Sequence, residues 1–492
     1  MSDDISGIGL ALKEQLKIRR LLFCIFSVLV TMSSVPALAS DHEKLLITNV
    51  RILELGETQP IITADMSVLV SDGVIEQVAP DIPAAVSDGA VVIDGAGRIL
   101  MPGLVDMHVH IWDEAALGAY LANGVTTVRN ASGMPMHLDL AERIRAGKLE
   151  GPRLITTGPI LNSPGPNAQI NHQMVTTDDE ARAAVRAQQE AGFRRLKVYS
   201  NLTREAYEAV LDEARKLGMT VMGHSPEGTR AKGMPYEIPF EIAFEDLIYD
   251  GFVTIEHIES IVWHGLRDRH DPEAARVLGE KIAQAGVAVD PTLLSFYNLL
   301  RVAETRGEYL SRPGVEVLNP LLVEQEKPNY ERWESEDVER NRKAFEFYKQ
   351  ATRIFAEAGV LLVTGSDAGI FTNIPRRSLI KEMELLHEAG LSPLQVLRAA
   401  TVNPAIALGE QDRFGAIAKG QRADFLLLEN DPAEDLAALK MPSAVVADGR
   451  YYDQEDLQRL NAAASQHNPE RTQRNLVEGL QAQGVDVSIL GL

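Results

Sequence analysis

The chain has 492 residues, of which 45% are hydrophobic and 24% are charged, so a disordered, collagen-like or coiled-coil chain is excluded for most of its length. Acidic side chains outnumber basic ones by 70 to 48, which gives a formal net charge of −22. Because nucleic acids and anionic membranes select basic surfaces, neither is expected as the main partner. The length exceeds the roughly 250 to 400 residues of one barrel domain and leaves room for an added module.

The first 39 residues have the features of a secretory signal peptide. Basic residues at 17, 19 and 20 precede an apolar run over 21–32, and Ala37-Leu38-Ala39 follows. This run is shorter than the ~20 residues of a membrane-spanning helix, although an uncleaved anchor is the alternative. The single cysteine, Cys24, lies inside the run, so the mature chain would lack cysteine, as suits an oxidising compartment. We expect an exported protein, periplasmic or secreted, with no membrane contact after cleavage.

Short β-rich segments occur near both ends of the chain. The pairs Asp72-Gly73 and Asp94-Gly95 are typical of hairpin turns between such segments. Together these segments predict a small β-sandwich composed of residues 40–101 and 411–455. The segments are 45–53, 66–80, 90–100, 414–431 and 443–452.

The middle of the chain, residues 102–410, alternates between apolar strand candidates and helical stretches such as 204–218, which Gly218 would end. Eight strand–helix repeats predict an α/β fold, a closed (β/α)8 TIM barrel, with its active site at the carboxyl ends of the strands. A dinucleotide-binding fold is disfavoured because the chain has no G-x-G-x-x-G turn. The candidate strands are 104–110, 124–130, 153–158, 195–199, 219–224, 252–257, 287–291 and 360–367.

Two further segments lie outside this regular pattern. Residues 292–359 separate the last two strands by more than one helix and its loops require, and they include a charged, helix-like run over 336–359. This insertion would form a lid, an oligomer contact or a solvated helical excursion. Residues 456–492 are expected to form a polar C-terminal tail with partial disorder.

Six side chains that can bind metal ions lie at or near the ends of the predicted strands. His108 and His110 point to the same side of the first strand, because residues two apart in a strand share a face. A lone strand histidine is usually a core residue, but the coincidence of all six at the active-site edge favours a functional site. The six residues are His108, His110, Lys197, His224, His257 and Asp367.

The composition of this group indicates a metal centre. Four imidazoles and a carboxylate suit zinc or another first-row divalent ion. Lys197 is informative, because a protonated ammonium between two dications would be strongly repelled. Its neutral amine can react with carbon dioxide, and the resulting carbamate is an anion able to bridge two metal ions. Two such ions would share one water and lower its pKa toward neutrality, so that a bridging hydroxide becomes the nucleophile.

Five motifs extend this interpretation: VDMHVH (105–110), RRLKVYS (194–200), VMGHS (221–225), TIEHIES (254–260) and VTGSDAG (363–369). With these motifs the chain resembles the amidohydrolase superfamily, in its binuclear branch with a carbamylated lysine. The resemblance covers about residues 45–452. It is greatest for the group related to imidazolonepropionase, which includes Xaa-Pro dipeptidases and the ochratoxin-hydrolysing amidase.

The resemblance implies a role for each ligand. Around the Lys197 carbamate it implies two ligand sets, with His108, His110 and Asp367 on one metal, and His224 and His257 on the other. Asp367 would take a proton from the hydroxide and give it to the leaving amine. Tyr199 shares a strand face with Lys197 and is either a donor to the developing oxyanion or a rim residue packed under the lid.

Other polar residues are candidates for substrate contact or for a different reaction. Glu227 stands three residues after His224, where mononuclear deaminases of this superfamily carry a proton-shuttling glutamate, so deamination is an alternative. A substrate carboxylate would need a cation near the site. The candidate substrate contacts are Arg129, Arg376 and Arg377 as cations, and His172 in the loop after the third strand.

We therefore predict a metal-dependent hydrolase of carbon–nitrogen bonds that cuts the amide of a dipeptide or N-acyl amino acid. The expected cofactors are two divalent metal ions, zinc foremost, and carbon dioxide for the Lys197 carbamate. The expected partners are a small-molecule substrate and, by resemblance, further copies of the chain in a homo-oligomer. Lactone or ester hydrolysis at the same centre, and an inactive metal-binding scaffold, are the alternatives left open.

Overall fold

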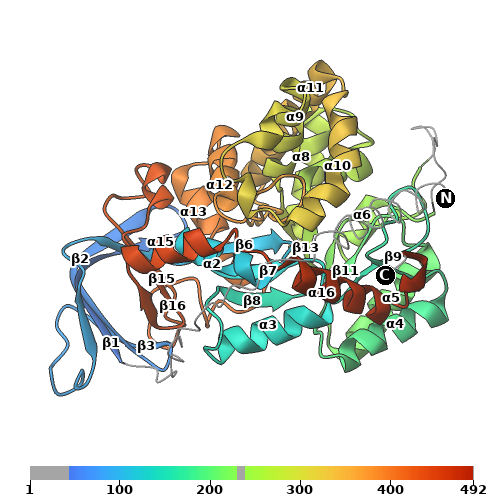
Figure 1. Cartoon of the computed structure of the whole chain (residues 1–492). Coiled ribbons are helices and arrows are strands. Elements are labelled where there is room, and N and C mark those ends of the chain that lie inside the picture. Colours follow the sequence, from blue (N-terminus) through green and yellow to red (C-terminus); the bar gives the residue numbers. More distant parts are fainter. Residues whose placement is uncertain (1–43, 230–238, 491–492) are drawn as a thin grey trace.

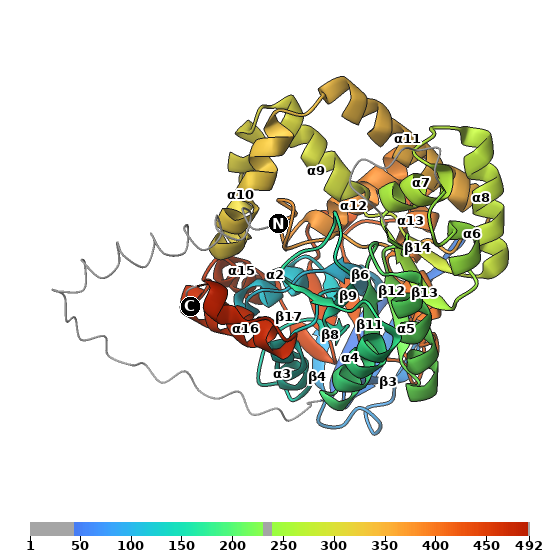
Figure 2. The same ribbon diagram turned by 90° about the vertical axis from the view of Figure 1, so that its right-hand side faces the viewer.

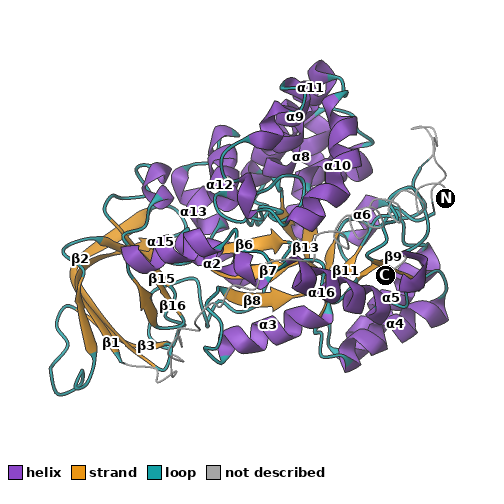
Figure 3. Cartoon of the chain, viewed as in Figure 1, coloured by secondary structure: helices purple, strands orange, loops and turns teal. Residues whose placement is uncertain are grey.

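The structure, a computed structural model, describes residues 44–229 and 239–490. The predicted signal peptide, residues 1–39, lies outside the described residues. Within these two ranges, no helix combines the length and the apolar character that a membrane crossing requires. Figure 3 shows a β-sheet at one end of the molecule and helices around the central strands.

Strands from both ends of the chain form one eight-stranded sheet (Figure 1), in the order β17-β16-β15-β5-β1-β2-β3, with β4 paired to β1. The two ends of the chain meet where β15 pairs antiparallel with β5, at Leu426 opposite Met101. The two ends of the chain therefore combine as predicted, in one sheet, and their arrangement as a β-sandwich stays a prediction. The strands are β1 (Leu45–Leu55), β2 (Pro60–Ser71), β3 (Val74–Ala79), β4 (Val91–Asp94), β5 (Ile99–Pro102), β15 (Phe425–Leu428), β16 (Ala444–Ala447) and β17 (Arg450–Tyr452).

The two predicted hairpin turns differ in outcome. Asp72 and Gly73 join β2 to β3, and both have positive φ angles, 51° and 74°, as a two-residue hairpin turn requires. The prediction for Asp94-Gly95 is wrong, because β4 and β5 both run parallel to β1 and follow one another along it. The pair marks a break between two strands in line, where glycine avoids a side chain against Val50 and the carbonyl of Thr48.

The central strands are all parallel and lie in two sheets. One sheet has the order β6-β7-β8 and the other the order β10-β9-β11-β12-β13-β14. Seven of the eight predicted barrel strands correspond to seven of these strands. The strands are β6 (Leu104–Val109), β7 (Val125–Asn130), β8 (Arg153–Thr156), β9 (Ile160–Asn162), β10 (His172–Met174), β11 (Arg195–Val198), β12 (Thr220–Gly223), β13 (Phe252–Glu256) and β14 (Ala288–Asp290).

The eighth predicted strand, 360–367, runs between the two central sheets. It forms isolated parallel bridges with both of them, at Leu362 opposite Val289 and at Ala368 opposite Val109. On the other side, the N–H of Gly158 after β8 donates to the carbonyl of Arg195 at 2.8 Å. The result is a TIM-barrel-like α/β fold in which the sheets do not merge into one ring, so closure of the barrel stays a prediction.

Helices surround these strands (Figure 2). The stretch predicted from 204 forms α5, which ends at Gly218 with a φ of 63°, the left-handed conformation typical of a helix C-cap. The helices are α2 (Leu117–Ala122), α3 (Pro135–Arg145), α4 (Asp178–Glu190), α5 (Arg204–Leu217), α6 (Phe244–Leu247), α7 (Ile258–Leu266), α8 (Pro272–Ala285), α9 (Leu293–Glu304), α10 (Pro320–Glu334), α11 (Val338–Glu357), α12 (Ser378–Glu388), α13 (Pro393–Ala399), α14 (Val402–Ala407), α15 (Gln454–Ala463) and α16 (Pro469–Ala482).

The insertion 292–359 forms helices α9, α10 and α11, which stand above the central strands in Figure 1. The charged run predicted as helical is α11, whose apolar face is buried through Phe345, Ala351 and Phe355. This face packs against α8 and α9. Helix α11 is therefore anchored to the fold by one apolar stripe, as expected for an amphipathic helix.

The segment predicted as a partly disordered tail instead contains two packed helices. Leu457 and Leu460, three residues apart on α15, are buried against α2, and Leu480 of α16 is also buried. Asp453 and Asn468 cap the two helix N-termini with side-chain hydrogen bonds. The prediction was wrong because the low apolar content hid a few buried leucines at helical spacing.

Replacing Phe425 by Ala is expected to destabilise the fold by about 3–5 kcal/mol, because this fully buried ring lies on the strand that joins the two ends of the chain. Urea denaturation followed by circular dichroism measures the loss. Val92→Ala is the control, since this side chain is 61% exposed and its loss should change stability by less than about 0.5 kcal/mol. Equal effects of the two changes would contradict the assigned role of β15.

Candidate metal centre

The structure brings together the six side chains that the sequence singled out as metal ligands. They come from the carboxyl ends of parallel strands and of the eighth strand segment, and all six line one cavity. Five are buried and His224 is half-buried. His108 lies in β6 and Lys197 in β11, while His110, His224 and His257 follow β6, β12 and β13, and Asp367 follows the eighth strand segment.

His108 Nε2 is the atom around which the first group is arranged. Lys197 Nζ lies 3.0 Å from it, and Asp367 Oδ1 lies 3.6 Å from it. The same carboxylate oxygen is 3.0 Å from His110 Nε2. The three side chains His108, His110 and Asp367 thus offer ligand atoms that all lie within 4.8 Å of one another.

The other two histidines adjoin this group. The ring of His257 has its centroid 4.8 Å from that of His108 and 4.4 Å from that of His224. His224 Nδ1 is buried and has no hydrogen-bond partner among the described residues. A buried, unpaired imidazole nitrogen is costly unless it binds something, so the donor set fits metal ions of the zinc type.

Three of the histidines are oriented by hydrogen bonds at Nδ1, on the side away from the shared centre. The partners are Glu256 Oε2 for His108 at 2.7 Å, Ser132 Oγ for His110 at 2.7 Å and Thr292 Oγ1 for His257 at 2.6 Å. Such contacts fix the ring and its tautomer, and they leave Nε2 available for a metal ion.

Glu256 is itself held in place by a buried cation. Arg129 Nη2 lies 2.9 Å from Glu256 Oε1, and Arg129 Nε donates to the carbonyl of Met107 at 2.7 Å. Burial opposes ionisation of Glu256, but the charge of Arg129 and the contact with His108 hold its pKa well below the usual range. Arg129, predicted as a substrate contact, instead lies beneath the centre and does not line the cavity.

The environment of Lys197 favours its neutral amine. The side chain is 1% exposed, and burial lowers its pKa to about 8, against the opposing effect of Glu256 and Asp367. About a tenth of this amine is therefore uncharged at pH 7, against less than roughly a thousandth for a lysine of ordinary pKa.

A buried aspartate positions both ends of the first ligand group. Asp106 accepts hydrogen bonds from Ser366 N at 2.9 Å, Ser366 Oγ at 2.5 Å and His108 N at 3.3 Å. It thereby ties β6 to the turn that presents Asp367. Ser295 Oγ donates to Asp367 Oδ2 at 3.0 Å and fixes the carboxylate.

The sequence analysis did not single out these supporting residues, although three of them lie inside its own motifs. Asp106 belongs to VDMHVH, Glu256 to TIEHIES and Ser366 to VTGSDAG. A polar residue next to a ligand in an apolar strand was an available signal. Ser295 and Thr292 follow β14 and carry no comparable signal, because only the folded chain brings them to the centre.

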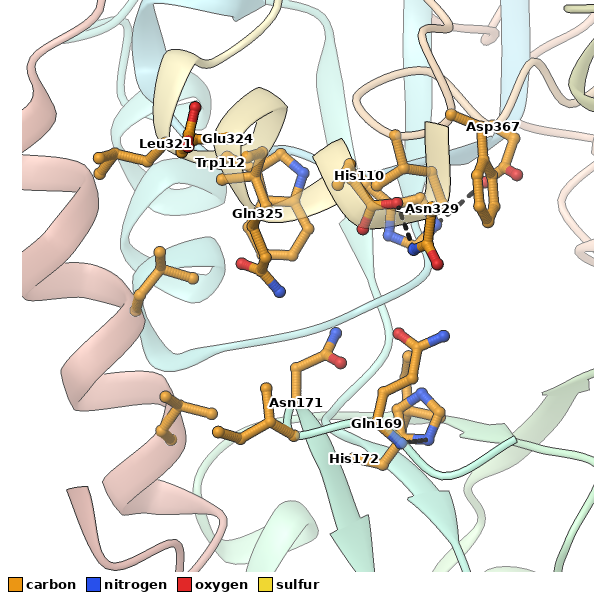
Figure 4. Close-up of a pocket in the computed structure, with 18 of the residues that line it drawn as sticks. His110, Trp112, Gln169, Asn171, His172, Leu321, Glu324, Gln325, Asn329 and Asp367 are labelled. Carbon is orange, nitrogen blue, oxygen red and sulfur yellow. Dashed lines mark hydrogen bonds and ion pairs between the residues drawn. The ribbon is translucent and has the colours of Figure 1, made fainter. Parts of the chain in front are cut away.

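The cavity has a volume of about 540 Å³ and extends outward from the centre. Its outer part is lined by helix α10, from the insertion for which a lid was one expectation, and by helix α16, which the sequence analysis did not place at the site. Figure 4 shows Leu321, Glu324 and Gln325 of α10 on one side of the cavity and Asn171 and His172 on the opposite side.

Two of the predicted substrate-contact and oxyanion candidates line the cavity. His172 is buried, which lowers its pKa to about 3, and its Nδ1 lies 3.1 Å from Asn162 Nδ2. The Tyr199 ring lies between His172 and His224, with centroid distances of 4.6 and 3.9 Å. Burial raises the pKa of the Tyr199 hydroxyl, which keeps its proton available for donation.

The other candidates lie elsewhere. Arg376 and Arg377 are not among the described residues that line the cavity, and Arg377 is exposed at the start of α12. Glu227 does not line the cavity either, and its Oε1 accepts a hydrogen bond from Trp263 Nε1 at 3.0 Å. The geometry thus gives no support to Glu227 as a proton shuttle.

Comparisons with known proteins agree with this site. An imidazolonepropionase of Deinococcus deserti is 40% identical over 85 residues, which cover 17% of this chain and 21% of that relative, so the chain matches about a fifth of its length. An ochratoxinase of Aspergillus niger is 22% identical over 473 residues and aligns with 83% of this chain and 86% of its own.

Among solved structures, a bottromycin amidohydrolase superposes with a TM-score of 0.69 and 25% identity, over 90% of this chain and 92% of that one. Residues 337–451 match the profile described as the amidohydrolase family, a region that includes Asp367 and the β15–β17 strands. Residues 337–451 therefore carry an amidohydrolase family domain, and the comparisons together indicate that the chain is a hydrolase.

Proposed function

We propose that this chain hydrolyses an amide bond of a small, peptide-like molecule at a centre of two divalent metal ions, with zinc the expected metal. The observation that carries the proposal is the presence of four histidines, Lys197 and Asp367 in one cavity, with Lys197 Nζ 3.0 Å from His108 Nε2. A lysine among the histidines favours two metal ions, because a carbamate formed on its amine would be an anionic ligand able to serve both. The names of the bottromycin amidohydrolase and the ochratoxinase fit amide cleavage as the reaction.

In this proposal the ligands divide into two sets. His108, His110 and Asp367 would hold one metal ion, and His224 and His257 would hold the other. The neutral Lys197 amine would add carbon dioxide and release one proton, and the resulting carbamate would supply an anionic ligand in place of a positive charge that would repel the metal ions. When bound, the metal ions polarise the scissile carbonyl as Lewis acids and lower the pKa of the attacking water.

The protein supplies the proton transfers and the orientation. Asp367 accepts a proton from the water as it attacks and then donates that proton to the nitrogen of the leaving amine. The hydrogen bond from Ser295 Oγ to Oδ2 keeps Oδ1 directed to the centre. Tyr199, which retains its proton, donates to the oxygen that develops negative charge.

The proposal also includes the wider organisation of the protein. Residues 102–410 would form a closed catalytic barrel, and residues 40–101 and 411–455 a composite sandwich. The bridges of residues 362 and 368 support the barrel, and the shared eight-stranded sheet supports a joint domain of the two chain ends. We propose in addition that the chain is exported after removal of residues 1–39 and assembles as a homo-oligomer.

Metal content tests the two-metal centre. Protein purified with zinc and bicarbonate is expected to contain close to two metal ions per chain, and Lys197→Ala should reduce this number sharply because the bridging ligand is lost. Lys216→Ala, on the exposed face of α5, is the matched control. A content near one per chain that Lys197→Ala does not change would refute the two-metal mechanism.

Asp367→Asn is expected to lower kcat for amide hydrolysis by roughly 10²–10⁴-fold, because an amide cannot accept and return the proton. Single-turnover kinetics on metal-loaded protein measures the effect, with metal content determined on the same sample. Asp250→Asn, whose carboxylate accepts a hydrogen bond from Tyr207 at 2.7 Å, should leave kcat unchanged. Full activity of Asp367→Asn with both metals bound would remove its proposed role.

Glu256→Gln is expected to weaken metal binding by about 10–100-fold, since the neutral amide holds His108 less firmly and leaves Arg129 without its anionic partner. Competition with a chromophoric chelator measures the affinity. Glu410→Gln is the matched control, because this glutamate pairs with Arg153 and Arg195 at the amino ends of β8 and β11. If the two variants bound metal equally well, the supporting role of Glu256 would be wrong.

A further inference from the structure

The outer part of the cavity is walled by two helices with an apolar surface. Leu321 and Leu322 of α10 and Leu476, Val477 and Leu480 of α16 all line it. Leu322 is buried with Trp112, and Leu321 and Leu476 pack against the same cluster. We call these five residues, two on α10 and three on α16, the apolar wall. Its two halves come from segments 320–334 and 469–482, far apart in the sequence but adjacent in the fold.

Hydrogen bonds to a buried carboxylate hold α16 in this position. The Asp113 carboxylate, 0% exposed, is bound by Arg471 through Nη2 at 2.6 Å and Nε at 3.1 Å. Thr472 Oγ1 donates to the same carboxylate at 3.2 Å and accepts from Asn319 Nδ2 at 3.0 Å. Asn319 is the N-cap of α10, so one network joins both helices to the loop that follows His110.

The hydrogen bonds of this network are strong enough to hold α16 in a fixed position. A bidentate arginine–carboxylate pair with a buried acid is stronger and more specific than an exposed ion pair. Because Asp113 follows Trp112, which itself lines the cavity, the wall is held in register with the metal ligands of β6. Helix α16 is therefore an integral part of the cavity wall.

The charge around the wall is negative. The acidic residues that line this part of the cavity are Glu324, Glu326 and Glu470, and uncharged amides line it at Gln325, Asn329 and Gln473. Apart from Lys197 and the histidines, no basic side chain lines the cavity among residues 44–229 and 239–490. A substrate carboxylate here would face like charges without a compensating cation.

We propose that the apolar wall of α10 and α16 binds a bulky, apolar and uncharged part of the amide substrate and disfavours a free carboxylate there. This inference rests on the proposed amide hydrolase function and narrows it. Amides whose far end is an aromatic or aliphatic group fit the wall, whereas a dipeptide with its terminal carboxylate against the wall does not. Arg471 and Asp113 act as positioning residues for this specificity.

Matched anilides test the charge preference. In 4-methylacetanilide and 4-acetamidobenzoate the same amide carries either a methyl group or a carboxylate at one ring position. The reversed pair, with the ring on the acyl side, covers the other orientation of the substrate. We expect at least a tenfold higher kcat/KM for the methyl compound in one of the two pairs, since a buried charge without a partner is strongly disfavoured.

Truncation of the wall tests its contact with the substrate. Leu476→Ala is expected to lower kcat/KM for the apolar anilide about tenfold more than for N-methylacetamide, chiefly through KM, because the lost methyl groups contact the bulky substrate only. Leu321→Ala is the second variant, in case the first does not fold. Val323→Ala, exposed on α10 and absent from the cavity lining, is the control.

Arg471→Ala tests the positioning network. It should reduce selectivity for the apolar anilide in the same direction as Leu476→Ala, without loss of bound metal, because it frees α16 from Asp113. The readout that separates this from general damage is the ratio of kcat/KM between the bulky and the small amide.

The outcomes separate the two proposals. If metal-loaded wild-type protein hydrolyses none of these amides, the proposed function fails. If it hydrolyses them but prefers the carboxylate compounds, or if neither wall variant changes the selectivity ratio, the proposed function stands and the inference about the wall is overturned.

Discussion

The centre depends on a buried ion pair between Arg129 and Glu256. Both side chains are at most 1% exposed, and such charges are tolerated in a protein interior only when they are paired and hydrogen-bonded. Glu256 meets this requirement by bonding to Arg129 from β7 and to His108 from β6. The pair thus joins three strands, and it directs His108 so that its Nε2 faces Lys197 and Asp367. Removing either charge would leave the other unpaired beneath the metal ligands.

The second constraint is a strained backbone at the ligands themselves. His257 and Asp367 have positive φ angles of 65° and 53°, which non-glycine residues seldom adopt and which cost of order 1–3 kcal/mol each. The contacts of Asp106 with Ser366 and of Thr292 with His257 hold these conformations. Gly365 is needed beside them, since a Cβ there would lie 2.1 Å from an oxygen of Asp290. Two of the positive φ angles among the described residues thus fall on proposed metal ligands.

The helices over the cavity, α10 and α16, constrain which molecules can reach the centre. A metal centre on parallel strands can polarise many carbonyl compounds, so selectivity must come from the walls around it. Here α10 comes from an insertion between β14 and the eighth strand segment, and α16 comes from the end of the chain. Their shared network at Asp113 makes the two segments one structural unit. The arginines expected to bind a substrate carboxylate do not line this cavity, whose outer part is acidic and apolar.

The sequence by itself was enough to predict the six side chains that meet in one cavity, seven of the central parallel strands and the resemblance to amidohydrolases. Ligands at strand ends recur at intervals set by one strand and one helix, and parallel strands bring those ends to one edge. The pattern could not determine Ser295 and Thr292, the wall of α10 and α16, or the position of Arg129. Arg129 was predicted to bind a substrate carboxylate because the sequence does not show which way an arginine side chain at a strand end points. Only tertiary structure decided these points, because they depend on which distant segments pack together to satisfy buried charges and cover apolar surface.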